Sequence, residues 1–200
     1  MNTPSHLGRK AFSLVEILVS IGIVAVLATV TTPLIKGAIT RAHIAQSTNN
    51  LREISNISKM YVNDNDGQYP PVWNKETGKT WLDILWPYAQ GDRKNPGLGA
   101  ALRGTVFYTP LLEKGVTARS YGMNLALEDN NKNRRYQFLP NSSRIALFGD
   151  TAASSTLSPS QIHARNAGSA GVAFVDGHVS QVPKDQIPKT VSDIFWNGKM

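Results

Sequence analysis

The sequence has no cysteine among its 200 residues, which excludes disulfide bonds and thiolate metal sites. It also lacks a phosphate-binding P-loop, a GxGxxG dinucleotide motif and a serine in a nucleophile elbow. No pair of acidic residues stands out at the helical spacing that acid–base catalysis would favour. We therefore expect a protein that is not an enzyme and that has no cofactor.

The basic residues are not gathered into one stripe, although the chain has a formal net charge of +7 and a pI near 9.7. One segment does place basic residues beside aromatic ones, a pattern that can hold phosphates and stack on bases. Its candidate nucleic-acid contacts are Lys132, Arg134, Arg135 and Tyr136. A solvated loop leading into a strand explains the same residues, and we do not expect nucleic acid to be a partner.

The average composition hides a long apolar stretch from Phe12 to Ile35. As a helix that rises about 1.5 Å per residue, this stretch is long enough to cross a hydrocarbon core of roughly 30 Å. The polar residues before it end in Arg9, Lys10 and a small residue, and positive charge favours a cytoplasmic location for this end. The sequence therefore predicts one membrane-spanning helix, followed by an exported domain.

Glu16 interrupts the apolar stretch close to its start. A carboxylate at bilayer depth costs on the order of 2.5 kcal/mol or more, so it needs a partner or a position at the interface. An ordinary secretory signal gives no reason for this acid, although residues 26–28 offer a small-residue site that signal peptidase accepts. A plain membrane anchor with Glu16 at the interface is the simpler alternative.

The run Lys10-Ala11-Phe12-Ser13-Leu14-Val15-Glu16 resembles the prepilin-type cleavage and methylation segment of type IV pilins and type II secretion pseudopilins. The resemblance implies that a prepilin peptidase cuts between Ala11 and Phe12 and methylates the new amine of Phe12. It also implies an assembly role for Glu16, the fifth mature residue, and Pro33 matches a proline that is frequent at the twenty-second. Ala11 stands where glycine is usual.

In that family, the glutamate of an incoming subunit pairs with the terminal amine of its neighbour, which offsets the desolvation of both charges. The resemblance thus implies a structural, pilin-like subunit whose partners are the prepilin peptidase, copies of itself and other pilin-like subunits, the inner-membrane assembly machinery, and the lipid bilayer before assembly. It implies a single-pass protein of the bacterial inner membrane with a cytoplasmic N-terminus. A long pilus and a short pseudopilus both remain open.

Two other functions remain open at this point. The first is a minor pilin that binds DNA or a surface. The second is a membrane-anchored binding protein that never polymerises, for which Glu16 would be dispensable.

The helix is expected to continue past the membrane, because apolar residues recur at helical spacing on one face. They are Ile44, Leu51, Ile54, Ile57 and Tyr61, and the polar face carries Arg41, Gln46, Asn49, Arg52 and Ser55. The Asn- and Asp-rich run 63–67 predicts a turn that ends the helix near Asn63. The predicted division is a leader (1–11), a membrane and filament-core helix (12–36), an amphipathic continuation (37–63) and a head (64–200).

The head is expected to be α+β, so that the whole chain would be a long, pilin-like hydrophobic helix packed against a small antiparallel sheet. Trp81, Ile84, Leu85 and Tyr88 predict a short helix in TWLDILWPYA. Strands are expected at Thr105–Tyr108 and within the runs SYGMNLAL, SRIALFGDT and GVAFVDGHVSQV.

The Asp176-Gly177 pair predicts a two-residue type I′ hairpin turn. This turn would place Val175 opposite His178 and Phe174 opposite Val179, with Val172, Phe174 and Val179 on one core-facing side.

The same segment resembles the end of a pseudopilin-like subgroup with a processing-associated motif of histidine, nine residues and Asp-Gly. Asn166 stands at the histidine position, and His163 lies three residues earlier. The side chains His163, His178, Asp150 and Asp176 are of types that bind divalent metals, but tight-turn architecture explains them better, and we predict no metal site.

Overall fold

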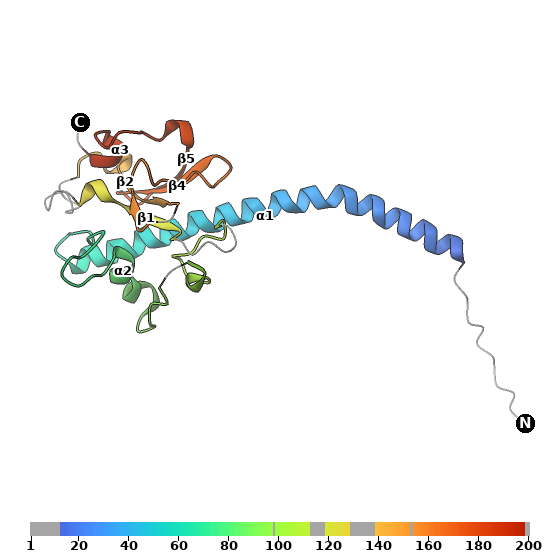
Figure 1. Ribbon diagram of the computed structural model, residues 1–200, viewed down its shortest axis with the longest axis horizontal. Helices are drawn as coiled ribbons and strands as arrows, with labels where there is room; N and C mark the ends of the chain where they lie inside the picture. Colours follow the sequence, from blue (N-terminus) through green and yellow to red (C-terminus); the bar gives the residue numbers. More distant parts are fainter. Residues whose placement is uncertain (1–12, 98, 113–118, 129–138, 153, 199–200) are drawn as a thin grey trace, which may run out of the picture. The chain divides into compact units, whose positions relative to one another are not determined.

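The structure is a computed structural model that describes residues 13–97, 99–112, 119–128, 139–152 and 154–198. The chain divides into two units, Met1–Ala42 and His43–Met200. Helix α1 (Leu14–Asp64) begins in the first unit and ends in the second. The predicted long N-terminal apolar helix is therefore present, and the second unit is the α+β head (Figure 1).

The head contains one five-stranded sheet in the order β3-β1-β2-β4-β5. The strands are β1 (Tyr121–Asn124), β2 (Ala146–Asp150), β3 (Thr156–Leu157), β4 (Ser169–Phe174) and β5 (Val179–Pro183). Three of the pairings are antiparallel, but β1 and β3 run parallel, with Met123 opposite Thr156. The expectation of a purely antiparallel sheet was therefore wrong, because the short strand β3 joins the edge in the same direction as β1.

Short helices lie before, between and after these strands. They are α2 (Trp81–Gln90), α3 (Ile194–Asn197) and the 3₁₀ turns Gly99–Leu102, Leu125–Leu127, Ser142–Arg144 and Lys184–Gln186. The 3₁₀ turn at Leu125–Leu127 replaces the second half of the strand that SYGMNLAL predicts. Its start is fixed by the Asn124 side chain, which accepts a hydrogen bond from the Ala126 N–H.

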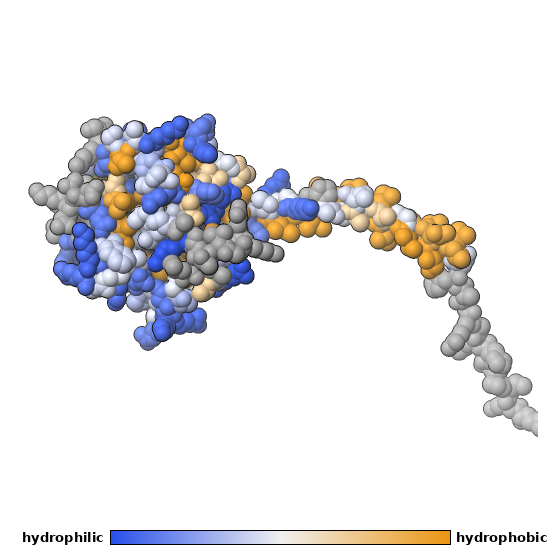
Figure 2. All heavy atoms as spheres, viewed as in Figure 1, coloured by the Kyte–Doolittle hydropathy of each residue, from blue (hydrophilic) through white to orange (hydrophobic). Residues whose placement is uncertain are grey.

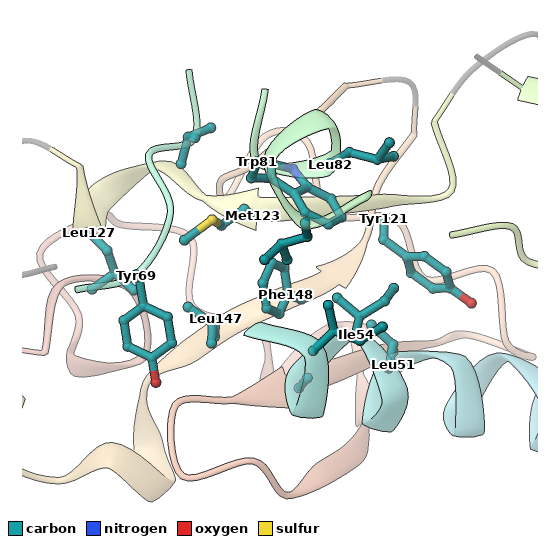
Figure 3. Close-up of a cluster of buried hydrophobic side chains, with 14 of the residues drawn as sticks. Leu51, Ile54, Tyr69, Trp81, Leu82, Tyr121, Met123, Leu127, Leu147 and Phe148 are labelled. Atoms are coloured by element: carbon teal, nitrogen blue, oxygen red, sulfur yellow. The ribbon is translucent and has the colours of Figure 1, made fainter. Parts of the chain in front are cut away.

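Apolar side chains cover both faces of the sheet. The larger cluster lies between the sheet, the last part of α1 and α2, and it includes Leu51, Ile54, Trp81, Met123 and Phe148, all buried (Figure 3). The second cluster lies on the opposite face and combines strand residues with the C-terminal segment. Its members are Ala146, Leu157, Ala170, Val172, Phe174, Ile187, Phe195 and Trp196.

The predicted stripe on the last part of α1 is confirmed at its centre, where Leu51, Ile54 and Ile57 are at most 3% exposed. Ser55 was assigned to the polar face, and this was wrong, because it is buried together with Ser47 and Ser58. Short hydroxyl side chains let a helix approach the sheet closely.

Helix α1 ends at Asp64, one residue beyond the predicted end. The turn that follows uses Asp66 and Gly67, both with positive φ.

Helix α2 confirms the prediction from TWLDILWPYA. Thr80 and Asp83 form a capping box at its start, with the Thr80 N–H donating to Asp83 Oδ2 at 2.8 Å. Trp81 and Leu85 are fully buried, as expected for one apolar face. Pro87 lies inside the helix, close to its end.

The strand predicted at Thr105–Tyr108 was wrong, because this segment forms consecutive turns. The Thr105 hydroxyl donates to the Leu102 carbonyl at 2.7 Å, and the Tyr108 N–H donates to the Thr105 carbonyl at 3.3 Å. Local bonds of this kind compete with strand pairing, and threonine makes them readily.

The β4–β5 hairpin is present, but its predicted turn type and register were wrong. Ala173, not Phe174, lies opposite Val179. Gly177 has a φ of 99°, whereas Asp176 is not among the residues with positive φ, so the connection has three residues and ends in a glycine bulge. This shift of one residue places Val179 with Ala173 on the α1 side, opposite to Val172 and Phe174.

Candidate functional site

The first part of α1 exposes nearly all of its apolar surface. The large apolar side chains between Leu14 and Ile35 are 48–76% exposed in this unit, and Figure 2 shows them as an apolar surface along the helix. The stretch extends roughly 33 Å at 1.5 Å per residue, which is long enough to cross a membrane. Exposed apolar surface of this size is typical of membrane or protein interaction sites, and the described residues of its own unit do not cover it.

Glu16 lies in the first turn of α1, where a negative charge interacts favourably with the helix dipole. Its Oε2 accepts a hydrogen bond from the Ser13 N–H at 2.9 Å. Within the described residues the carboxylate makes no ion pair. Glu16 is therefore an acid at one end of an exposed apolar helix, open to a cation from another molecule.

Pro33 lies within α1 and lacks the N–H that would otherwise bond to the carbonyl of Thr29. The turn before it carries three threonines whose hydroxyls donate to carbonyls three or four residues earlier. The pairs are Thr29 to Val26 at 2.7 Å, Thr31 to Leu27 at 2.9 Å and Thr32 to Ala28 at 2.7 Å. Such bonds are associated with bent helices, and together with Pro33 they weaken the backbone support of this part of the helix.

Several predicted residues lie outside the described part of the chain. These are Ala11 and Phe12 at the predicted cleavage site and the candidate nucleic-acid contacts Lys132, Arg134, Arg135 and Tyr136.

In the head, a buried carboxylate is the centre of a polar network. Asp150 ends β2 with no exposed surface, and its Oδ2 accepts from the Gly171 N–H at 2.7 Å and the Asn166 amide at 3.1 Å. The Arg165 Nε lies 3.7 Å from Asp150 Oδ1, close enough for an ion pair but not for a hydrogen bond. Asn166 also donates to Gln181 Oε1 at 2.7 Å.

The network continues into helix α1, because Gln181 Nε2 donates to the Thr48 hydroxyl at 3.0 Å. It thus connects strand β2, the loop before β4, strands β4 and β5, and the helix. Sequence reasoning considered Asp150 only as a possible metal ligand and did not foresee Arg165, Gln181 or Thr48 as its surroundings. The available signal was the acid at the end of the apolar run IALFGD, because a carboxylate that is buried needs hydrogen-bond or charge partners.

Burial raises the pKa of Asp150 to about 6, although Arg165, the Gly171 N–H and the Asn166 amide each act to lower it. Tyr121, opposite Asp150 in the β1–β2 pair, is also buried, and burial together with the nearby Asp150 charge raises the pKa of its hydroxyl. Desolvation is therefore the dominant electrostatic effect at this position.

A second group of buried hydroxyls joins the head to α1. Ser47 Oγ lies 2.9 Å from the Tyr121 hydroxyl and accepts from the Thr109 hydroxyl at 3.1 Å. Further along the helix, Lys59 Nζ donates to the Asp176 carbonyl at 2.9 Å. Polar contacts thus hold the last part of α1 to the rest of the head at Ser47, Thr48 and Lys59, in addition to its apolar stripe.

The four side chains considered as metal ligands do not form one cluster. His178 Nδ1 lies 2.7 Å from Asp176 Oδ1 at the hairpin, and its ring stacks on Phe174 at 4.3 Å. The His163 N–H donates to the Asp150 carbonyl at 2.9 Å, so this contact uses the backbone of both residues. Across the described ranges, no three His, Asp or Glu side chains come together as metal ligands.

Comparisons of the chain with protein-family models, curated proteins and solved structures find no match.

Proposed function

We propose that this protein is a structural, pilin-like subunit whose apolar helix first spans the inner membrane and then packs against other copies in a filament of the type II secretion or type IV pilus class. In this proposal a prepilin peptidase removes residues 1–11, and Phe12 becomes the methylated N-terminus. The chain is the substrate of the peptidase and has no catalytic role.

The observation that carries the proposal is the exposure of the helix between Leu14 and Ile35. Burying apolar surface gives about 25 cal/mol per Å², so a helix of this kind is most stable in lipid or among other apolar helices. Both environments are required of a subunit that is stored in a membrane and then assembled.

The surroundings of the Glu16 carboxylate favour an assembly role over a plain membrane anchor. The carboxylate stays exposed and lacks an ion pair within the described residues. A free amine at Phe12 would lie one helical turn before it, so neighbouring copies would offer each other opposite charges. Pairing in an apolar surrounding offsets desolvation that neither charge bears well alone.

The last part of α1 supports the remaining feature, a head fixed to the assembly helix. Leu51 and Ile54 are fully buried in the head core, and Ser47, Thr48 and Lys59 bond to it. The last part of the helix is thus an integral part of the head.

The experiment compares Glu16→Ala with Glu53→Ala in the native host. Both variants remove one exposed acid from α1, but Glu53 lies on the part of the helix that carries the head. We expect Glu16→Ala to abolish the sheared filament fraction while the protein remains in the membrane, and Glu53→Ala to leave filaments intact.

Normal filaments from Glu16→Ala would overturn the assembly role of this acid. A wild-type protein that stays monomeric in the membrane when the assembly machinery is present would instead identify a permanent anchor.

A further inference from the structure

The basic residues directly after the apolar stretch form an uncompensated positive segment. Lys36 and Arg41 are both exposed, and they make no ion pair within the described part of the chain. The sequence has no Asp or Glu between Glu16 and Glu53, so no acid neighbours them along the helix. We name Lys36 and Arg41 the basic band.

The position of the basic band corresponds to the depth of lipid headgroups. The apolar stretch extends roughly 33 Å, close to the thickness of about 30 Å for a hydrocarbon core. Lys36 follows it immediately, and Arg41 lies about 7.5 Å further along the helix axis. When the stretch spans the bilayer, both cations therefore lie in the headgroup layer of one leaflet.

The surface between the two cations leaves room for a headgroup. Gly37 lacks a side chain, and a Cβ added there would meet nothing within 4 Å. Ala38 follows it, and the Thr40 hydroxyl bonds back to the Lys36 carbonyl at 3.1 Å, so this side chain does not extend outward as a free donor. The two long basic side chains thus lie on either side of the small residues Gly37 and Ala38.

We propose that the basic band binds the phosphates of anionic phospholipids and fixes the depth of the helix in the membrane before assembly. Phosphate is the negative group found at this depth in every phospholipid bilayer, and exposed basic residues beside an apolar stretch are attracted to an anionic surface. The inference depends on the membrane-spanning step of the proposed function, but not on cleavage or filament formation.

The test uses the full-length chain reconstituted into vesicles of phosphatidylcholine and phosphatidylglycerol. Electron spin resonance of spin-labelled lipids measures which lipid contacts the protein, and protease protection reports whether the helix spans the bilayer. The variant is Lys36→Gln/Arg41→Gln. The matched control is Lys75→Gln/Lys79→Gln, which removes two exposed charges from the head.

We expect the wild type and the control to prefer phosphatidylglycerol, with a preference that high salt weakens. The band variant should lose this preference, by up to about fivefold for each cation removed, while still spanning the bilayer.

An unchanged preference in the band variant would overturn the inference. So would a band variant with normal lipid preference but weaker cross-linking between copies, because the cations would then bind an acid of a second subunit. If the wild-type helix does not span the vesicles, the membrane step of the proposed function fails as well, whereas a spanning helix without lipid preference contradicts only the inference.

Discussion

Helix α1 places two different surfaces on one continuous element. From Leu14 to Ile35 its large apolar side chains are 48–76% exposed, whereas Leu51, Ile54 and Ile57 are at most 3% exposed. The exposed part is apolar on every side, and the buried part is apolar on one stripe only. A helix that is apolar all round belongs in a membrane or among other helices, and one with a single stripe belongs against one domain.

The two parts of the helix differ in what they contact. The buried part already packs against the head through its apolar stripe. It also bonds to the head through the Ser47 hydroxyl and the network around Asp150. Among the described residues, the exposed part makes no comparable contacts within its own unit. Variants that act on stability should therefore concentrate in the last part of the helix, and under the proposed function variants that act on assembly should concentrate in the first.

The largest contrast is expected from one substitution made in both parts. Leu51→Ala should destabilise the head by about 2–5 kcal/mol, because it leaves a cavity in a packed core. Leu27→Ala, at a site that is 59% exposed, should change head stability by less than about 0.5 kcal/mol. Denaturant unfolding in detergent, followed by the fluorescence of buried Trp81 and Trp196, measures both. Equal losses would contradict the division of the helix.

The second prediction concerns pH and the network that joins the head to the helix. The pKa of Asp150 is about 6 in the folded protein and 3.8 without perturbation, so the folded state holds this proton more tightly. This contribution to stability is complete below about pH 4 and is lost as the pH rises through 6, by about 3 kcal/mol. Urea unfolding between pH 3.5 and 7 measures the slope.

Asp150→Asn should flatten that slope, because it removes the titrating group. The matched control is Asp185→Asn, which changes an exposed acid in the same domain and should keep the slope. A wild-type head whose stability rises steeply between pH 4 and 6 would contradict the assigned direction of the Asp150 shift.

A third prediction compares two serines of α1. Ser47→Ala removes the partner of the buried Tyr121 hydroxyl and of Thr109, and it should cost about 1–3 kcal/mol. Ser20 is exposed and bonds only to the Glu16 carbonyl of its own helix, so Ser20→Ala should leave the melting temperature of the head unchanged. Adding Tyr121→Phe to Ser47→Ala should cost less than the sum of the two single changes, because it removes a hydroxyl that Ser47→Ala leaves with only its longer 3.3 Å bond to the carbonyl of residue 47.

The smallest effect is expected at two glycines. Gly177 has a φ of 99°, and a Cβ there would meet Lys59 Nζ, so Gly177→Ala should cost about 1–2 kcal/mol. Gly22 lies within the exposed helix with nothing near a new Cβ, and Gly22→Ala should strengthen that helix by up to about 1 kcal/mol. Thermal unfolding of the head reports the first change, and helix content by circular dichroism in detergent reports the second.

Periodicity alone was sufficient for the long helix, its buried stripe and α2. These elements depend on local spacing, which a single sequence displays directly. The burial of Ser55 was not predicted, because a serine in a sequence gives no sign of whether it is buried or exposed. Only the packing of the helix against the sheet decides between the two.

The sheet was harder to predict, because its details depend on partners distant in the sequence. Asp176-Gly177 fits a two-residue or a three-residue turn, and the choice between them shifts the whole register by one residue. Strand β3 has two residues and no periodicity of its own, so its parallel pairing with β1 was invisible. The Asp150 network combines residues from five segments, and only the fold brings them together.

The most direct test of the assembly account is the N-terminal sequence and intact mass of the protein isolated from membranes of its own host. The account predicts a chain that starts at N-methylated Phe12. A start at Thr29 would mean ordinary signal cleavage and a soluble head, and an intact Met1 would mean a permanent anchor; either result would contradict the assembly role of the exposed helix.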